Sequence, residues 1–345
     1  MDAFSFSDIV SHFWTFCPFL IALVYLFSAS RKRKSIPGEN RYKIEGYAVE
    51  DKASCCASCG KAEIDEVKLK DCACCDLVKY CSDGCQELHR PKHAEACKQR
   101  AAELRDELLF KQPESSSFGD CPICMLPLPL VMKKSMAYDC CSKSVCKGCT
   151  VANWMQDEEM RREKLCPFCR ATCPSTEEEC DKLRMKRVEA NDPVAIHKEG
   201  LKQYRKGEFI KAFDYWAKAV ELGNVETHFR LALSYLFSHG VDEDREKGIY
   251  HLEKAAIGGH PHARHGLGLE EVKNGNYERA LKHWIIAAAQ GNDDSIRMLK
   301  NAFKEGDLSK EDLTSALRAH KAAVDATKSP QREAAEEWYR NKFGK

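Results

Sequence analysis

The stretch CCSKSVCKGC at residues 140–149 decides what fold the middle of the chain can adopt. It places two adjacent cysteines just before a Cys-x-x-Cys pair, and two more such pairs flank it at residues 121–124 and 166–169. Cys-x-x-Cys spacing is typical of a zinc knuckle. Lys143 lies inside the stretch, but its ammonium group has no lone pair to offer a metal. Any further ligand here must therefore come from the adjacent cysteines.

The composition favours bound metal over disulfides. The chain has 345 residues, enough for two or three domains, and a formal net charge of +1, so we expect no nucleic-acid partner. Of its 20 cysteines, only Cys17 lies outside the interval from Cys55 to Cys180. Closely spaced pairs in that interval favour zinc bound by reduced thiolates in a reducing compartment. A disulfide framework is the alternative.

Residues 121–170 resemble a RING-type zinc finger, on the evidence of CPIC at their start and CPFCR at their end. The resemblance implies two zinc sites. The first is formed by Cys121, Cys124, Cys146 and Cys149, and the second by Cys140, Cys141, Cys166 and Cys169. Lys143 departs from the family, which has histidine at this position. A degenerate second site is the alternative.

In that family the finger has no nucleophile and no general base. It binds a ubiquitin-conjugating enzyme and holds the charged ubiquitin in a reactive geometry. The resemblance implies apolar contacts to that enzyme from Ile123, Trp154 and Pro167, and makes Arg170 the donor that bridges enzyme and ubiquitin. On the other interpretation, Ile123 and Trp154 are ordinary residues of a small core and Arg170 is a solvated charge.

A second cysteine-rich unit lies at residues 55–97 and offers eight possible ligands in four pairs. They are Cys56, Cys59, Cys72, Cys75, Cys81, Cys85, His93 and Cys97. A unit of this size cannot bury a sufficient core, so bound metal must supply folding free energy.

The order of these ligands, with YC at 80–81 and CQELHRPKHAEAC from Cys85, resembles the MYND-type zinc finger. It implies one zinc on Cys56, Cys59, Cys81 and Cys85, and another on Cys72, Cys75, His93 and Cys97. It also implies a surface that binds other proteins, often through short proline-containing peptides. We expect Cys55, Cys74 and His89 not to be ligands. Arg90 departs from the family, which often has tryptophan there.

The segment FWTFCPFLIALVYLFSAS, residues 13–30, predicts a transmembrane anchor. Its 18 uncharged residues, at about 1.5 Å each, nearly match a hydrocarbon core about 30 Å thick. RKRK follows at 31–34, which predicts a single-pass membrane protein whose bulk faces the cytosol. A cleaved signal peptide is the alternative because SAS offers small residues, and RKRK is a candidate nuclear signal. Residues 31–54 read as a polar linker.

The region 192–300 predicts a solenoid of helical repeats. Gly223, Gly259 and Gly291 recur at intervals of 36 and 32 residues, and Trp216 and Trp284 recur in step with them. These units resemble Sel-type repeats, relatives of the tetratricopeptide class, which implies a scaffold whose concave face binds another protein. We expect both tryptophans in the core and no metal on the histidines at 251, 260, 262 and 265.

The sequence as a whole predicts a multidomain protein. It has an N-terminal transmembrane helix, then two small zinc-stabilised α+β modules that hold up to four ions, then an all-α solenoid. Residues 98–120 should form a helix and linker, and 301–345 a helical charged tail. The predicted function is a membrane-anchored RING-type ubiquitin ligase that recruits partners through the MYND finger and the repeats. A non-enzymatic adaptor is the alternative, and transcriptional regulation is a third reading that requires nuclear residence.

Overall fold

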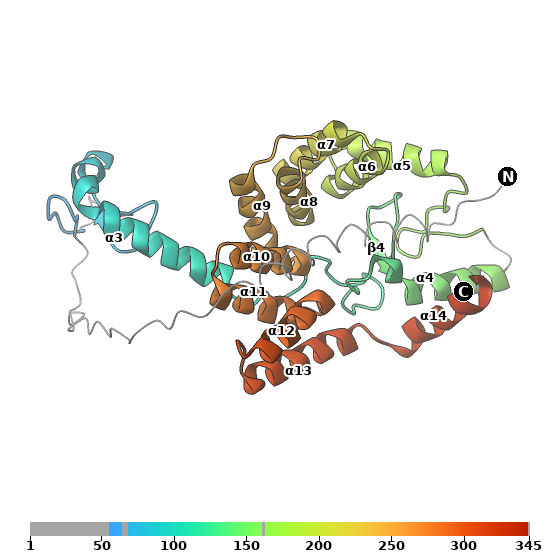
Figure 1. Cartoon of the computed structure of the whole chain (residues 1–345). Coiled ribbons are helices and arrows are strands. Elements are labelled where there is room, and N and C mark those ends of the chain that lie inside the picture. Colours follow the sequence, from blue (N-terminus) through green and yellow to red (C-terminus); the bar gives the residue numbers. More distant parts are fainter. Residues whose placement is uncertain (1–54, 64–67, 161–162, 344–345) are drawn as a thin grey trace. The chain divides into compact units, whose positions relative to one another are not determined.

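The computed structural model describes residues 55–63, 68–160 and 163–343 (Figure 1). The predicted anchor at 13–30 and the polar linker at 31–54 lie outside the described residues. Among the helices that the structure describes, none combines the length and the apolar character needed to cross a bilayer.

The first cysteine-rich module, residues 55–97, contains one small antiparallel sheet and the start of a long helix. Strand β1 (Lys70–Asp71) pairs with β2 (Lys79–Tyr80), and helix α3 (Asp83–Leu109) follows. The Ser82 side chain caps α3 by accepting a hydrogen bond from the Cys85 amide. The described residues that are buried in this module are three cysteines, Tyr80 and His93. Because so little apolar surface is buried, the module depends on metal to fold.

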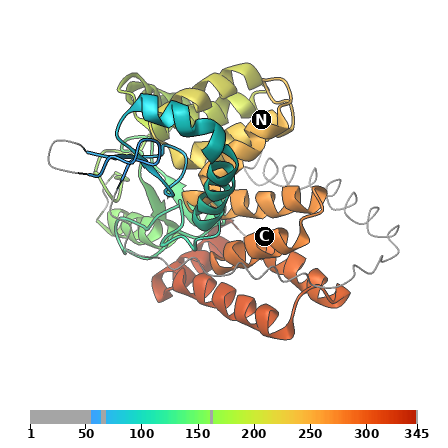
Figure 2. The same ribbon diagram turned by 90° about the vertical axis from the view of Figure 1, so that its left-hand side faces the viewer.

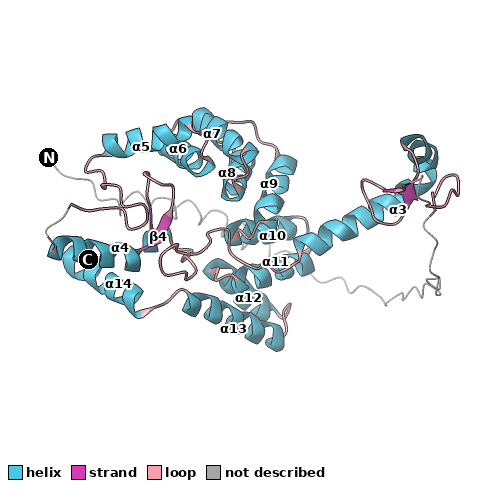
Figure 3. Cartoon of the chain, turned by 180° about the vertical axis from the view of Figure 1, so that it is seen from behind, coloured by secondary structure: helices cyan, strands magenta, loops and turns pink. Residues whose placement is uncertain are grey.

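The second cysteine-rich module, residues 121–170, has a similar plan. A short 3-10 turn (Met132–Lys134) leads into β3 (Ser135–Ala137), which pairs antiparallel with β4 (Ser144–Cys146), and α4 (Lys147–Glu159) follows. Figure 3 shows how little of the described chain is strand. Leu128, Tyr138 and Val145 join four cysteines in the buried core.

The rest of the chain is a helical array. Its helices are α5 (Glu177–Glu189), α6 (Pro193–Arg205), α7 (Phe209–Glu221), α8 (Val225–Leu236), α9 (Arg245–Ile257), α10 (Pro261–Lys273), α11 (Tyr277–Ala289), α12 (Asp293–Glu305), α13 (Lys310–Ala326) and α14 (Pro330–Phe343). Successive helices from α5 to α13 stack on one another (Figures 1 and 2). The three glycines that recur in the sequence each follow a helix end with φ of 84–89°, a conformation that other residues adopt at a cost.

Two tryptophans lock neighbouring helices of the array together in the same way. Trp216 donates its indole N–H to the carbonyl of His197, and Trp284 donates to the carbonyl of His265, both at 3.3 Å. The prediction that both tryptophans lie in the core is confirmed, since they are 2% and 4% exposed. The shared geometry explains their spacing in the sequence.

Helix α3 continues beyond the first module and ends on the array. The boundary expected at residue 97 falls inside this one helix of 27 residues. Leu109, at its end, is buried among residues of α8, α9 and α10. The buried Arg264 donates hydrogen bonds to the carbonyls of Leu109 and Ala256. The helix therefore forms a continuous link between the first module and the array.

The last helix, which falls within the charged tail predicted at 301–345, contacts the second module. α14 packs along α4 of the second module, although more than 170 residues separate them in the chain (Figure 1). The linker residue Ser117 also contacts the array, donating its amide to the Gly259 carbonyl at 3.0 Å. The second module thus lies against α14, which follows the repeats, and the linker before this module contacts the array.

Candidate metal centres

Four groups of potential metal ligands converge in the described part of the chain. Within each group, all ligand atoms lie within 4.8 Å of one another. The groups are Cys56, Cys59, Cys81 and Cys85; Cys72, Cys75, His93 and Cys97; Cys121, Cys124, Cys146 and Cys149; and Cys140, Cys141, Cys166 and Cys169. Three groups therefore offer four thiols, and the second offers three thiols and an imidazole.

The distances between sulfurs fit zinc. Tetrahedral zinc with Zn–S bonds of about 2.3 Å places its sulfur ligands about 3.8 Å apart. The hydrogen-bonded sulfur pairs in these groups lie from 3.4 Å (Cys140 and Cys169) to 3.9 Å (Cys141 and Cys166) apart. A disulfide would hold two sulfurs about 2.05 Å apart, and all the described cysteines are free thiols. The geometry supports metal ligation and not a disulfide framework.

The fold of the first module lowers the pKa of two of its ligand thiols, Cys56 and Cys72. Burial raises the pKa of Cys56, but hydrogen bonds from the backbone amides of Cys59 and Cys81 outweigh it and lower the pKa to about 6. Burial likewise opposes ionisation of Cys72, and the Cys74 amide is the main group that lowers its pKa to about 6. Thiolates are the form that binds zinc, so the fold favours ligation.

His93 and His89 occupy different roles. The Nε2 atom of His93 lies 3.2 Å from the Cys75 sulfur, inside the second ligand group. His89 stacks on His93 with ring centroids 5.8 Å apart, and its Nδ1 atom meets the Tyr80 hydroxyl at 3.1 Å. His89 therefore contributes packing and orientation while its neighbour faces the cluster.

In the second module, the Cys121 cluster (Cys121, Cys124, Cys146 and Cys149) forms around the start of α4. The Cys146 amide donates to the Cys121 sulfur and the Cys149 amide donates to the Cys146 sulfur, both at 3.4 Å. Burial raises the pKa of Cys124, yet the Leu126 amide and the Arg332 guanidinium lower it to about 7. Backbone amides from a tight loop thus orient the cluster, as in other zinc knuckles.

The Cys140 cluster (Cys140, Cys141, Cys166 and Cys169) contains both members of the adjacent cysteine pair. Ser142 follows the pair with φ of 56°, and this left-handed residue turns the chain sharply. The turn is closed by a hydrogen bond of 2.9 Å from the Tyr138 amide to the Lys143 carbonyl. The Lys143 ammonium lies 5.9 Å from the Phe168 ring, and its residue is not part of the ligand group.

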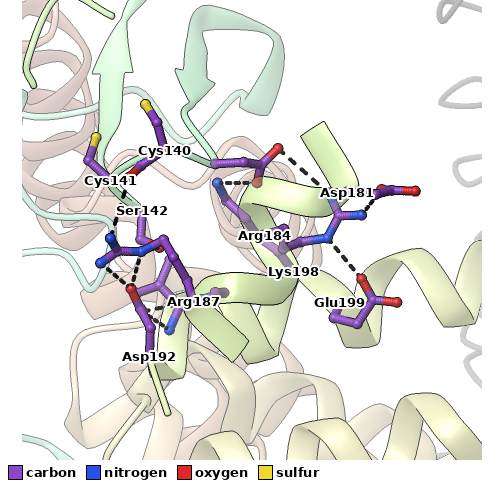
Figure 4. A network of polar contacts seen from close by, with 12 residues as sticks. Cys140, Cys141, Ser142, Asp181, Arg184, Arg187, Asp192, Lys198 and Glu199 are labelled. Carbon is purple, nitrogen blue, oxygen red and sulfur yellow. Dashed lines mark hydrogen bonds and ion pairs between the residues drawn. The ribbon is translucent and has the colours of Figure 1, made fainter. Parts of the chain in front are cut away.

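Charged residues of α5 and α6 form hydrogen bonds and ion pairs with the segment that carries Cys140 and Cys141 (Figure 4). Asp139, just before the pair, accepts from Lys198 at 3.1 Å and lies 3.6 Å from Arg184. Arg187 donates to the Ser142 hydroxyl at 2.9 Å and to the Cys140 carbonyl at 3.4 Å. The sequence did not point to Arg184, Arg187 and Lys198, because they resemble the charged residues of an ordinary solvated helix face.

The four residues that the RING resemblance implies as enzyme contacts differ in their exposure to solvent. Ile123 is 42% exposed, whereas Trp154 and Pro167 are half-buried. Arg170 donates to the Asn153 side chain at 2.6 Å and lies 3.8 Å from the Asp157 carboxylate, both on α4. Its guanidinium is therefore held against the module's own helix.

Comparisons with known proteins agree with two of the three modules. The family model for the MYND finger matches residues 56–97, and the model for the Sel1 repeat matches residues 196–224, 225–260 and 263–292. An uncharacterised Sel1-like repeat-containing protein of Schizosaccharomyces pombe is 26% identical over 122 residues. The match covers 34% of this chain and 18% of that protein, so the chain spans less than a fifth of its length.

Two solved structures are also similar to parts of the chain. A protective antigen with an SLR fold from uropathogenic Escherichia coli is 24% identical, with a TM-score of 0.36, and covers 47% of this chain and 37% of its own. A Sel1 repeat protein from Oxalobacter formigenes is 20% identical, with a TM-score of 0.39, and covers 56% and 86%. The family matches show that the chain carries a MYND finger followed by three Sel1 repeats, and its ligand groups fit up to four zinc ions.

Proposed function

We propose that this protein is a zinc-dependent adaptor that brings two protein partners together, one on the MYND finger and one on the Sel1 repeats. The observation that carries the proposal is the continuous helix α3, which begins inside the finger and ends buried in the repeat array. Two binding modules that are joined without a flexible linker hold their partners at a defined separation, which raises the effective concentration of one partner near the other.

The contacts at both ends of α3 support this role. Arg100 in α3 binds Asp76 of the finger at 2.7 Å, while Asp106 and Arg105 pair with Arg279 and Glu253 of the array. Exposed ion pairs contribute little each, about 0–1 kcal/mol. Burial of Leu109 therefore provides most of the stability of this junction, and the ion pairs set its orientation.

The finger offers exposed apolar side chains to a partner. Leu77 and Leu88 are 52% and 78% exposed, an unusual degree for leucine in so small a module. A short proline-containing peptide is the partner that the MYND resemblance suggests. Such a peptide gains affinity by burying apolar surface of this kind.

A peptide-display selection with the full-length chain tests this proposal. Leu88→Asp should abolish enrichment of proline-containing peptides. Leu108→Asp is the matched control, because Leu108 is 59% exposed on the same helix but outside the finger. Equal enrichment by both variants would refute the assignment of the finger surface.

A second candidate function is RING-type ubiquitin transfer by the second module. It is favoured by the cluster geometry and by the exposure of Ile123 and Phe168, which lie within the first and last Cys-x-x-Cys pairs of the module. On this proposal the module binds a ubiquitin-conjugating enzyme and ubiquitin. Arg170 would have to leave Asn153 to bridge them.

Self-ubiquitination of the full-length chain with a panel of conjugating enzymes tests this second candidate. Activity should fall in Ile123→Ala and in Arg170→Ala. Activity that survives both substitutions together would refute the roles given to these residues. Peptide binding by the finger would be unaffected by either variant, so the two proposed functions are tested separately.

We also propose that residues 13–30 anchor the protein in a membrane, with the remainder in the cytosol. The uncharged segment followed by RKRK supports this localisation. Resistance to alkaline carbonate extraction, together with protease sensitivity of the repeats in intact vesicles, is the expected result. Nuclear residence of a tagged full-length chain would contradict it.

A further inference from the structure

The C-terminal helix α14 brings two polar side chains to the Cys121 cluster. Arg332 is only 7% exposed, and its guanidinium donates to the Cys124 sulfur at 3.4 Å. The neighbouring residue Gln331 places its side-chain oxygen Oε1 3.9 Å from the Cys149 sulfur, where it accepts from the thiol. Two successive residues of one helix thus approach two ligands of one cluster.

Arg332 is fixed in place by several hydrogen bonds. Besides the sulfur, its guanidinium donates to the carbonyls of Pro127 at 2.7 Å, Leu126 at 3.1 Å and Thr327 at 2.7 Å. The helix approaches so closely that a Cβ atom on Gly148 would lie 2.9 Å from the Arg332 Cγ atom. Glycine at 148 is therefore part of the same arrangement.

The charge of a zinc tetrathiolate explains why a guanidinium belongs there. Four thiolates and one divalent cation carry a net charge of about −2, and a buried net charge is costly unless an opposite charge or hydrogen-bond donors compensate it. Among the described residues, this is the ligand group in which an arginine donates to a ligand sulfur. A half-turn of the Gln331 amide would likewise direct its N–H group at the Cys149 thiolate.

We propose that Gln331 and Arg332 retain zinc in the Cys121 cluster by contacting the sulfurs of its ligands. We call these two residues the cap. The cap supplies positive charge and N–H donors to Cys124 and Cys149 from a helix far away in the sequence. It does not ligate the metal. The proposal concerns metal retention and is independent of the partners or the activity proposed above. Outer-shell partners of zinc ligands typically change metal affinity by about 10–100-fold.

Site-resolved alkylation tests the cap. The zinc-loaded full-length chain is challenged with a chelator, pulsed with an alkylating reagent and mapped by mass spectrometry. In Arg332→Met, the Cys121 cluster should become alkylated about tenfold faster than in the wild type. The Cys56 cluster (Cys56, Cys59, Cys81 and Cys85) is the internal control, and Arg340→Met is the matched variant because Arg340 is exposed on the same helix.

Substitutions that change the charge at the exposed Gln331 distinguish electrostatic stabilisation of the zinc cluster from a purely structural contact between α14 and the module. Gln331→Glu should speed zinc loss from the Cys121 cluster, and Gln331→Lys should slow it. In the Arg332→Met background, Gln331→Lys should restore part of the protection, which lost carbonyl contacts could not explain. Unchanged alkylation in Arg332→Met, equal acceleration at all four clusters, or absence of the opposite effects at Gln331 would each overturn the proposal.

Discussion

At the scale of single residues, the repeats depend on glycines that face tryptophans. A Cβ atom on Gly268 would lie within 3.0 Å of the Trp284 indole, and Gly200 has the same relation to Trp216. The glycine lets the indole reach the backbone carbonyl that it hydrogen-bonds. The spacing of the tryptophans was evident from the sequence, but their glycine partners were not, because those glycines lie mid-helix with no turn to mark them.

Gly268→Ala should therefore destabilise the array by about 1–3 kcal/mol, the usual cost of overpacking a core. The measurement is the thermal or urea unfolding midpoint of the full-length chain. Gly266→Ala provides the matched control on the same helix, since its Cβ would make only ordinary contacts of 3.5–3.6 Å with Leu252. That control should be neutral or stabilising, because alanine favours helix by about 1 kcal/mol over glycine. Equal midpoints would contradict this account.

Histidine burial predicts a loss of stability in acid. Burial lowers the pKa of His265 to about 4, against an ordinary value of 6.5, although Asp294 opposes the shift. The unfolded chain then binds protons first, so stability is lost as pH falls from about 6.5 towards 4. His265→Gln keeps a polar partner for Ser295 and should flatten this dependence. Trp284 fluorescence during unfolding at several pH values reports it, and an unchanged slope would refute the assignment.

At the scale of elements, helix α3 has two functions in one segment. Its first half carries ligands of the MYND finger, and its last residue fills a space between α8, α9 and α10. Pro91 lies within the helix without ending it. The sequence marks the end of the ligand pattern at Cys97, but nothing marks the end of the helix there, because helix-favouring residues continue to Leu109.

Leu109→Ala should loosen this junction, since truncating a buried leucine costs about 2–5 kcal/mol. The adjacent variant Leu108→Ala should change stability by less than about 0.5 kcal/mol, because Leu108 is 59% exposed. Hydrogen exchange at Ala256 and Ala263, which pack around Leu109, is the direct readout. Faster exchange in both variants, or in neither, would show that Leu109 does not hold the junction.

The zinc ligands and the repeats were predictable for the same physical reason. Cys-x-x-Cys pairs and repeating glycines are local patterns whose spacing is set by one loop or one helical turn. The contacts that join the modules are different in kind. Arg187 and Cys140 are 47 residues apart in the sequence, and Arg332 and Cys124 are 208 apart. No local sequence pattern therefore predicts either contact.

At the scale of the whole described chain, the second module is held by α6, which enters the first repeat, and by α14, which follows the last repeat. Lys198 of α6 binds Asp139 at 3.1 Å, and Glu336 of α14 binds Lys134 at 2.7 Å. The stability of this module and the order of the array's outer helices are therefore coupled. The central repeats, by contrast, have an apolar core around Leu252 and Leu267 to which Leu109 of α3 contributes and which contains no metal ligand.

Zinc removal should consequently destabilise some helices of the array more than others. Chelator treatment of the full-length chain should unfold both cysteine-rich modules and increase hydrogen exchange in α5 and α14. Exchange in α9 and α10 should stay within about twofold of the untreated value, since their core contains no metal ligand. Uniform acceleration across the array would contradict the coupling, and native spectroscopic signatures after complete chelation would contradict metal-dependent folding.

The long separation between Cys149 and Gln331 also bears on how the protein is made. A ribosome adds about 5–20 residues per second, so the 182 residues between them take roughly 10–40 s to synthesise. During that interval a nascent chain displays its cysteines before the helix that covers them has emerged. A product that ended before α14 would leave that thiol surface uncovered.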